Sequence, residues 1–204
     1  MKISILLLVS LLVTKVVLGA DPAPGDALRP SDPSGAATEQ SPPVADQSGR
    51  AITADMTLAT DVWTLVGEAR LKVLIWEVYD SALFTPSGHW QGDAPYRLSL
   101  HYLRNIPAAK LVEETEKAWR EQGRNHPRLN EWLGLLGDLW PDITEGDNLV
   151  FGLNELGDSA FWFNGSPLGS IEDRDFGPLF GGIWLYPATS RPELKAQLIR
   201  PPLK

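Results

Sequence analysis

The sequence contains no cysteine among its 204 residues and only three histidines, His89, His101 and His126. Without cysteine the chain cannot build a disulfide framework, and it has no thiol to carry a lipid anchor. The histidines do not stand at the spacing of a metal-ligand pair, and zinc sites depend on histidine and cysteine. We therefore expect no metal and no cofactor.

Sequence motifs of the common enzyme classes are also missing. The string NGSPLG differs in spacing from the Gly-x-Ser-x-Gly nucleophile motif, and neither dinucleotide-binding nor P-loop glycine patterns occur. The Asp and Glu residues fall in predicted turns and on helix faces, which is typical of solvated surfaces. The net charge is −8 and no basic run stands out, so nucleic acid is not expected as a partner.

The first 50 residues predict export rather than folded structure. Met1-Lys2 precede the apolar run ISILLLVSLLV, and small residues follow at Gly19-Ala20, so residues 1–19 predict a signal peptide. Lys15 interrupts the run and disfavours a permanent span; an uncleaved anchor is the alternative. Residues 20–50 are rich in Pro, Ser and Ala without an aromatic residue, which indicates a disordered linker. One domain, 51–204, remains, and we expect it to be periplasmic or secreted.

Alternation and helical periodicity predict strands and helices in two similar groups within this domain. The Asn164-Gly165 pair is a strong hairpin signal, and Ser190 with Glu193 predicts a capping box for the last helix. Residues 70–84 predict one long strand that is apolar on both faces, preceded by a turn at Gly67-Glu68. The predicted strands are 57–66, 70–84, 96–104, 149–154, 159–163 and 167–171, and the helices are 108–122, 128–140, about 176–186 and one from about 190. This order favours an α+β fold with an antiparallel sheet.

Two groups of residues leave alternatives open. All eight tryptophans lie in the folded part, and they are interpreted either as core packing or as the lining of a pocket for an apolar ligand. Glu77 and Asp80 interrupt the long apolar run. We expect them to face water at a bulge or strand end; the alternative is a carboxylate that faces a pocket.

Five sequence segments occur in this order along the chain: GEARLKVLIWEVYDSALF, LSLHYL, LWPDITEGDNLVF, FWFNGSPLGSIEDRDFGPLFGGIWL and TSRPEL. Together they resemble the chalcone isomerase-like family, in its bacterial exported branch, over about Leu65 to Leu198. The resemblance implies an open-faced β-sandwich, in which a large antiparallel sheet carries a helical layer on one face.

The resemblance also bears on activity. Plant members isomerise chalcones to flavanones with an Arg, a Thr, a Tyr and an Asn, whereas related members bind fatty acids in the same cleft and others are noncatalytic. The four plant positions fall here on Val62, Leu74, Ala108 and Thr115. None of the four residue types is kept, and Val and Leu cannot donate a hydrogen bond to a phenolate.

We therefore expect an exported, noncatalytic protein that holds an apolar small molecule or a fatty acid in a sheet–helix cleft. The residues expected to line this cleft are Leu74, Trp76, Tyr102 and Trp119. One alternative is an intramolecular lyase or isomerase, which would need a donor such as Arg70, Lys72 or Arg104 aimed into the pocket. A second alternative is a structural or partner-binding domain, with a filled interior and an exposed apolar patch.

Overall fold

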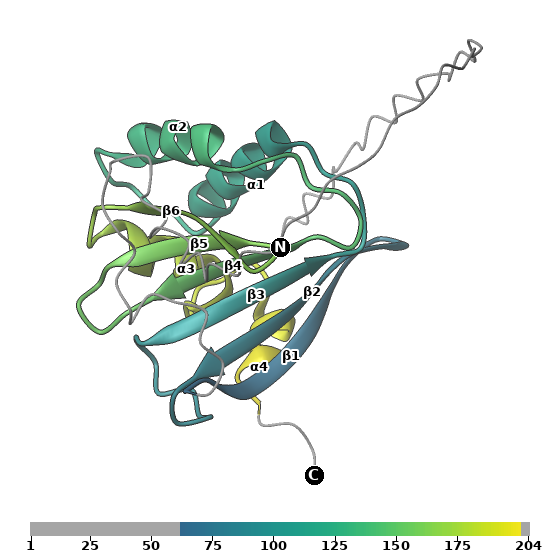
Figure 1. Ribbon diagram of the computed structural model, residues 1–204, viewed down its shortest axis with the longest axis vertical. Coiled ribbons are helices and arrows are strands. Elements are labelled where there is room, and N and C mark those ends of the chain that lie inside the picture. The colour runs from purple at the N-terminus through teal and green to yellow at the C-terminus, as the bar shows by residue number, and fades with distance from the viewer. Residues whose placement is uncertain (1–61, 201–204) are drawn as a thin grey trace, which may run out of the picture. The chain divides into compact units, whose positions relative to one another are not determined.

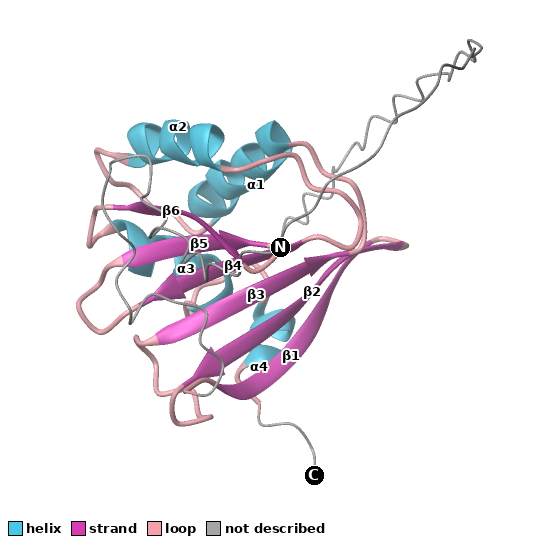
Figure 2. Cartoon of the chain, viewed as in Figure 1, coloured by secondary structure: helices cyan, strands magenta, loops and turns pink. Residues whose placement is uncertain are grey.

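A computed structural model describes residues 62–200 of the chain and shows one antiparallel sheet with helices (Figures 1 and 2). The six strands follow one another in the order β1-β2-β3-β4-β5-β6, so each pairs with its neighbour in sequence. The elements are β1 (Thr64–Val73), β2 (Trp76–Thr85), β3 (Tyr96–Tyr102), α1 (Ala108–Glu121), α2 (Leu129–Leu139), β4 (Asn148–Leu153), β5 (Ser159–Phe163), β6 (Ser166–Ile171), α3 (Phe176–Leu185) and α4 (Pro192–Leu198). The predicted α+β class and element order are confirmed.

The sheet has one heavily buried face, to which alternate residues of its strands contribute. In β3, Tyr96, Leu98, Leu100 and Tyr102 are all buried, as their spacing predicts. Helices α3 and α4 lie across this face, while α1 and α2 pack against each other beside α3 and β6 (Figure 1). The arrangement is an open sheet with its helical layer on one side.

Helix α3 approaches the sheet closely because its sequence alternates large and small residues. Phe176 and Phe180 stack one turn apart, with ring centroids 5.4 Å apart. Their neighbours Gly177 and Gly181 bring the backbone so near to Leu153 and Tyr96 that an added Cβ would collide with both side chains. The phenylalanine rings meet rings from β4 and β5, including Phe151 at 4.8 Å from Phe180.

The opposite face of the sheet carries a second, smaller cluster. Val150, Ala160 and Trp162 are buried there. The guanidinium of Arg97 lies between two indole rings, 4.4 Å from the centre of Trp63 and 4.9 Å from that of Trp162. Cation–π contacts of this kind allow a charged side chain to be buried against aromatic faces.

The prediction of one long strand over residues 70–84 is wrong. The chain reverses at Leu74-Ile75, between the paired residues Val73 and Trp76, and the predicted turn at Gly67-Glu68 lies inside β1. A run that is apolar on both faces conceals the reversal, because neither turn residue is a glycine, proline or asparagine. The residues expected to form one strand are therefore divided between the end of β1 and most of β2, while the number of strands is as predicted.

Of two other local predictions, the turn at Asn164-Gly165 is confirmed and the helix cap at Ser190 is not. The Asn164-Gly165 hairpin is confirmed, with positive φ angles of 50° and 82° at the two residues. The capping box at Ser190 is wrong, because α4 begins one residue later, with Pro192 in its first turn and Arg191 as a cap that makes no side-chain hydrogen bond. Proline fixes the φ of a first helical turn and so sets where the helix starts.

Some predictions fall on residues 1–61. The signal peptide, the linker and the first part of the strand expected at 57–66 lie outside the described residues. Within residues 62–200, no helix has both the length and the apolar character needed to cross a bilayer.

The contact of α4 with β1 yields a first prediction. A Cβ at Gly67 would lie 2.5 Å from the Leu198 carbonyl oxygen and 2.6 Å from that of Gln197. We expect Gly67→Ala to lower the free energy of unfolding by about 1–3 kcal/mol, because backbone must move to make room. Urea unfolding would measure the change. In the control, Gly134→Ala, the added methyl meets open space on α2 and should not destabilise the protein.

Candidate functional site

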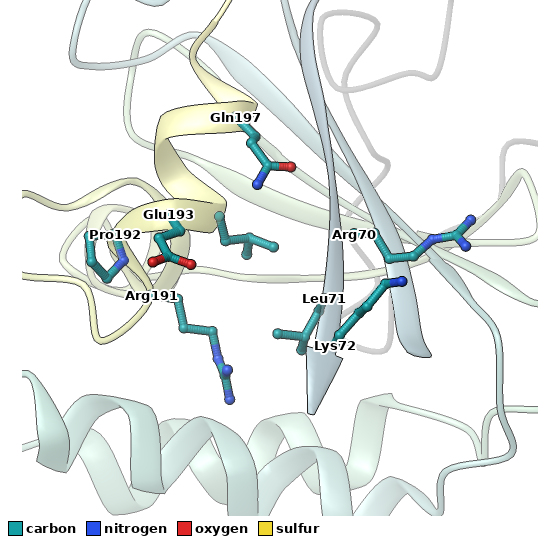
Figure 3. Close-up of a pocket in the computed structure, with 8 residues that line it drawn as sticks. Arg70, Leu71, Lys72, Arg191, Pro192, Glu193 and Gln197 are labelled. Carbon is teal, nitrogen blue, oxygen red and sulfur yellow. The ribbon is translucent and has the colours of Figure 1, made fainter. Parts of the chain in front are cut away.

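A groove opens at the edge of the sheet, between strand β1 and helix α4 (Figure 3). Its volume is about 450 Å³, which lies within the range of small-molecule sites. The residues that line it are Arg70, Leu71, Lys72, Arg191, Pro192, Glu193, Leu194 and Gln197. Four of these eight residues are charged, three are apolar and one is an amide, so the groove has a mixed lining.

Arg191 is the cation that faces this groove. Figure 3 shows its side chain extending into the space between α4 and the end of β1. The turn that carries it is fixed to α3: the Thr189 hydroxyl donates to the Ile183 carbonyl at 2.7 Å, and the Arg191 amide donates to that hydroxyl at 3.2 Å. Two hydrogen bonds thus hold the backbone from which the guanidinium projects.

A buried phenol lies close to this guanidinium. Tyr79 of β2 accepts a hydrogen bond from the Trp184 indole nitrogen at 2.9 Å and packs edge-on against Tyr102. Burial raises the pKa of Tyr79 to about 12, although the Trp184 hydrogen bond and the positive charge of Arg191 both favour the phenolate. At neutral pH Tyr79 is therefore a hydroxyl group, and it cannot serve as a base.

Arg70 and Lys72 contribute their stems to the groove but turn their charges away from α4 (Figure 3). Arg70 binds Asp80 through two nitrogens, at 2.5 and 2.7 Å, and Glu77 at 2.7 Å, while Lys72 binds the other oxygen of Glu77 at 2.7 Å. Glu77 and Asp80 lie at the surface, as predicted, and they neutralise these two cations rather than face a pocket.

The structure does not bring the four predicted lining residues together. Tyr102 is buried beside Tyr79, at the end of the sheet near the groove. Trp119 is buried between helices, where its indole nitrogen donates to the Leu179 carbonyl at 3.2 Å. Leu74 lies in the β1–β2 turn with 75% of its surface exposed, and Trp76 follows it with 43% exposed.

The misplaced strand explains the two outlying residues. Leu74 and Trp76 were expected to face the sheet–helix interface because a continuous strand would point them there, whereas the reversal places both at a hairpin end. That interface is occupied by aromatic rings, with Phe161 centred 5.3 Å from Phe180 and Trp140 5.7 Å from Phe161. The groove lies instead at the rim, beside the edge strand.

Sequence reasoning missed Arg191, the residue on which the site depends. The string TSRPEL contains it, and Pro192 at the start of a helix was a signal that the preceding side chain stands at a fixed helix entrance. The capping-box pattern placed the helix cap at Ser190, one residue before the actual cap, Arg191. The pairing of α4 with β1 could not be derived from local patterns.

Comparison with known proteins is consistent with this architecture. A model of the family described as chalcone isomerase-like matches residues 45–199. The chain belongs to the chalcone isomerase-like family. An uncharacterized protein of Haemophilus influenzae is 29% identical over 143 residues, which cover 67% of this chain and 68% of that protein. The family expected from the sequence is confirmed.

A solved structure gives the same fold. The crystal structure of an Arabidopsis thaliana fatty-acid binding protein superposes with a TM-score of 0.53 at 10% sequence identity, covering 76% of this chain and 95% of that one. At this identity the likeness concerns the fold alone. It confirms the expected sheet with a helical layer for this chalcone isomerase-like protein.

The side chains that line the groove determine which ligands it could hold. Among the eight lining residues none is histidine, and the single carboxylate is Glu193. In the part of the chain from 62 to 200 there is no group of three or more His, Asp or Glu residues that could hold a metal ion. A cation above Leu71 and Leu194 can hold an anion that carries an apolar body, because each part finds a matching surface.

The ion pairs of Arg70 yield a pH prediction. Hydrogen bonding and charge from Arg70 lower the pKa of Asp80 below its ordinary 3.8. This pairing therefore stabilises the fold above pH 3.8, and its contribution is lost as pH falls through the lower folded-state pKa. We expect Asp80→Asn to be slightly less stable than the wild type at pH 7, with the difference closing as the pH falls below 3.8. Thermal unfolding against pH measures it, and a difference unchanged at pH 2.5 would contradict the assignment.

Proposed function

We propose that this protein is a noncatalytic, exported carrier or sensor of a fatty acid, and that it binds the acid in the groove between β1 and α4. The observation that carries the proposal is the position of Arg191 at a groove whose other walls include Leu71 and Leu194. A carboxylate would lie against the guanidinium, and the acyl chain would extend along the apolar side chains.

The physical case rests on matched chemistry. Arginine offers paired N–H donors that fit a carboxylate, and such charge-assisted hydrogen bonds are about twice as strong as neutral ones. In residues 62–200 no carboxylate lies within ion-pair distance of Arg191, so its charge is available to a ligand. Arg70 and Lys72 pair with Glu77 and Asp80. Among the cations that line this groove, Arg191 therefore remains available to pair with a ligand.

Family membership and fold support the choice of ligand. The Arabidopsis thaliana protein that shares the fold is a fatty-acid binding protein, and membership of the chalcone isomerase-like family covers residues 45–199 here. The isomerase alternative needs a base or an activated donor at the ligand. Tyr79, with a pKa of about 12, stays protonated, and Arg70 and Lys72 point away from the groove.

Arg191 should therefore govern recognition of the acid head group. We expect Arg191→Gln to weaken palmitate binding about tenfold or more, because a charge-assisted hydrogen bond is lost. Binding of hexadecanol, which has the same chain without the charge, should change little. Isothermal titration with native mass spectrometry of the full chain measures both ligands.

The matched control is Arg120→Gln on α1. Arg120 is exposed, pairs with Glu116 at 2.8 Å and is not among the residues that line the groove, so its loss removes the same charge without changing the lining. Equal weakening by both substitutions would reduce the effect to net charge and refute the proposed head-group contact. Conversion of a chalcone to a flavanone by the wild type would restore the isomerase alternative.

We also propose export, on the basis of the N-terminal sequence. The apolar run after Lys2 and the small residues Gly19-Ala20 predict cleavage near Ala20. Intact-mass analysis of the protein from the periplasm of a Gram-negative host should show a chain that lacks residues 1–19. A full-length chain in the membrane fraction would support the uncleaved anchor instead.

A further inference from the structure

The end of the β1–β2 hairpin presents three consecutive apolar side chains to solvent. Leu74 is 75% exposed, Ile75 84% and Trp76 43%. Figure 1 shows the ends of β1 and β2 projecting beyond the neighbouring strands. We call Leu74, Ile75 and Trp76 the hairpin tip. Exposed apolar residues are common when they are scattered, but a contiguous projecting group indicates an interaction site.

The backbone of the tip is strained as well as apolar. Leu74 has φ = +56°, in the left-handed region where a side chain is disfavoured and glycine is usual. Glycine at this position would remove the strain and the exposed side chain together. The tip therefore carries two features, each unfavourable for an isolated folded protein.

Charged residues surround the base of the tip. The guanidinium of Arg104 lies 4.2 Å from the centre of the Trp76 ring, and no carboxylate in residues 62–200 is within ion-pair distance of it. Lys72 stands two residues before the turn and pairs with Glu77 at 2.7 Å. Exposed apolar groups therefore form the tip, with the Arg104 cation and the Lys72–Glu77 ion pair behind them.

We propose that the hairpin tip inserts into the interfacial region of a lipid bilayer. Leu74 and Ile75 would reach the boundary of the acyl chains. The Trp76 ring, with Arg104 on its face, would lie at the level of the head groups, where tryptophan and basic side chains are stabilised. Peripheral attachment of this kind needs no spanning helix.

The size of the tip favours a bilayer over a protein surface. A stable protein interface takes about 800 Å² and 20–30 residues from each partner. The tip offers three side chains on a narrow projection, and paired charges follow immediately behind it. A bilayer accepts a convex apolar projection without a complementary surface, because its acyl chains rearrange around it.

The tip is also next to the groove along the chain. Leu71 and Lys72, which line the groove, precede Leu74 by three residues or fewer in β1. Docking through the tip would hold that end of the groove near the membrane surface. The proposal does not depend on fatty-acid binding, and its test uses no fatty acid.

The chain contains no cysteine, so a single introduced thiol gives a local probe. Ile75→Cys in the full chain would be labelled with an environment-sensitive nitrobenzoxadiazole fluorophore. On addition of vesicles of phosphatidylethanolamine and phosphatidylglycerol (3:1), we expect a blue shift and an increase in emission. Leu156→Cys is the matched control: Leu156 is 64% exposed in the β4–β5 turn at the opposite end of the strands, and its label should not respond.

A second variant separates insertion from general attachment. Leu74→Gly with Ile75→Ser keeps a two-residue turn with glycine at the position of positive φ, so the hairpin should fold at least as well. Vesicle co-sedimentation should fall about tenfold or more, because burial of two large aliphatic side chains is lost. Leu156→Ser should sediment like the wild type.

Two results would overturn the proposal. Sedimentation with vesicles without any emission change at position 75 would place the attachment elsewhere in the chain, such as the apolar N-terminal run. A blue shift that appears without vesicles and grows with protein concentration would identify the tip as a contact between copies of this chain.

Discussion

The close approach of α3 to the sheet is the constraint on which the rest of the structure depends. Gly177 and Gly181 leave no space for a side chain against Leu153 and Tyr96, so the helix position is set by backbone contact. The chain then has only residues 186–191 in which to turn back before α4 begins. This short connection places α4 against β1, where the absence of a side chain at Gly67 allows close contact. The groove is the space that remains between β1 and α4.

The same packing decides where a ligand can bind. The rings of Phe151, Phe161 and Phe180 meet at centroid distances of 4.8–5.3 Å, which is the density of a structural core. A filled interior is what the structural or partner-binding alternative predicts, whereas the binder interpretation predicts a pocket. What separates these two interpretations is Arg191, a cation without an acidic partner in residues 62–200, whose side chain faces the groove beside Leu71 and Leu194. A residue that served packing alone would not need a positive charge at this position.

Local patterns predicted most of the fold, because most elements here are marked by their own residues. Alternation identified β3, and the Asn164-Gly165 turn identified the β5–β6 hairpin. The first hairpin was missed because Leu74-Ile75 carries no turn residue. The groove was missed for a different reason: it depends on the contact of α4 with β1, which are separated by more than 100 residues, and periodicity carries no information about such a pair.

The two tight hairpins of this sheet are built from contrasting turn residues. Both turns use two residues, and both need a residue with positive φ. At Asn164-Gly165 the chain uses the residues that adopt this conformation at little cost, and the turn is polar. At Leu74-Ile75, where Leu74 alone of the two has positive φ, the two-residue turn is built from bulky aliphatic residues that are exposed to water. The chain uses the common Asn-Gly turn in one hairpin, so the exposed Leu74-Ile75 turn in the other needs a reason outside folding. Insertion into a bilayer surface, as proposed above, is such a reason.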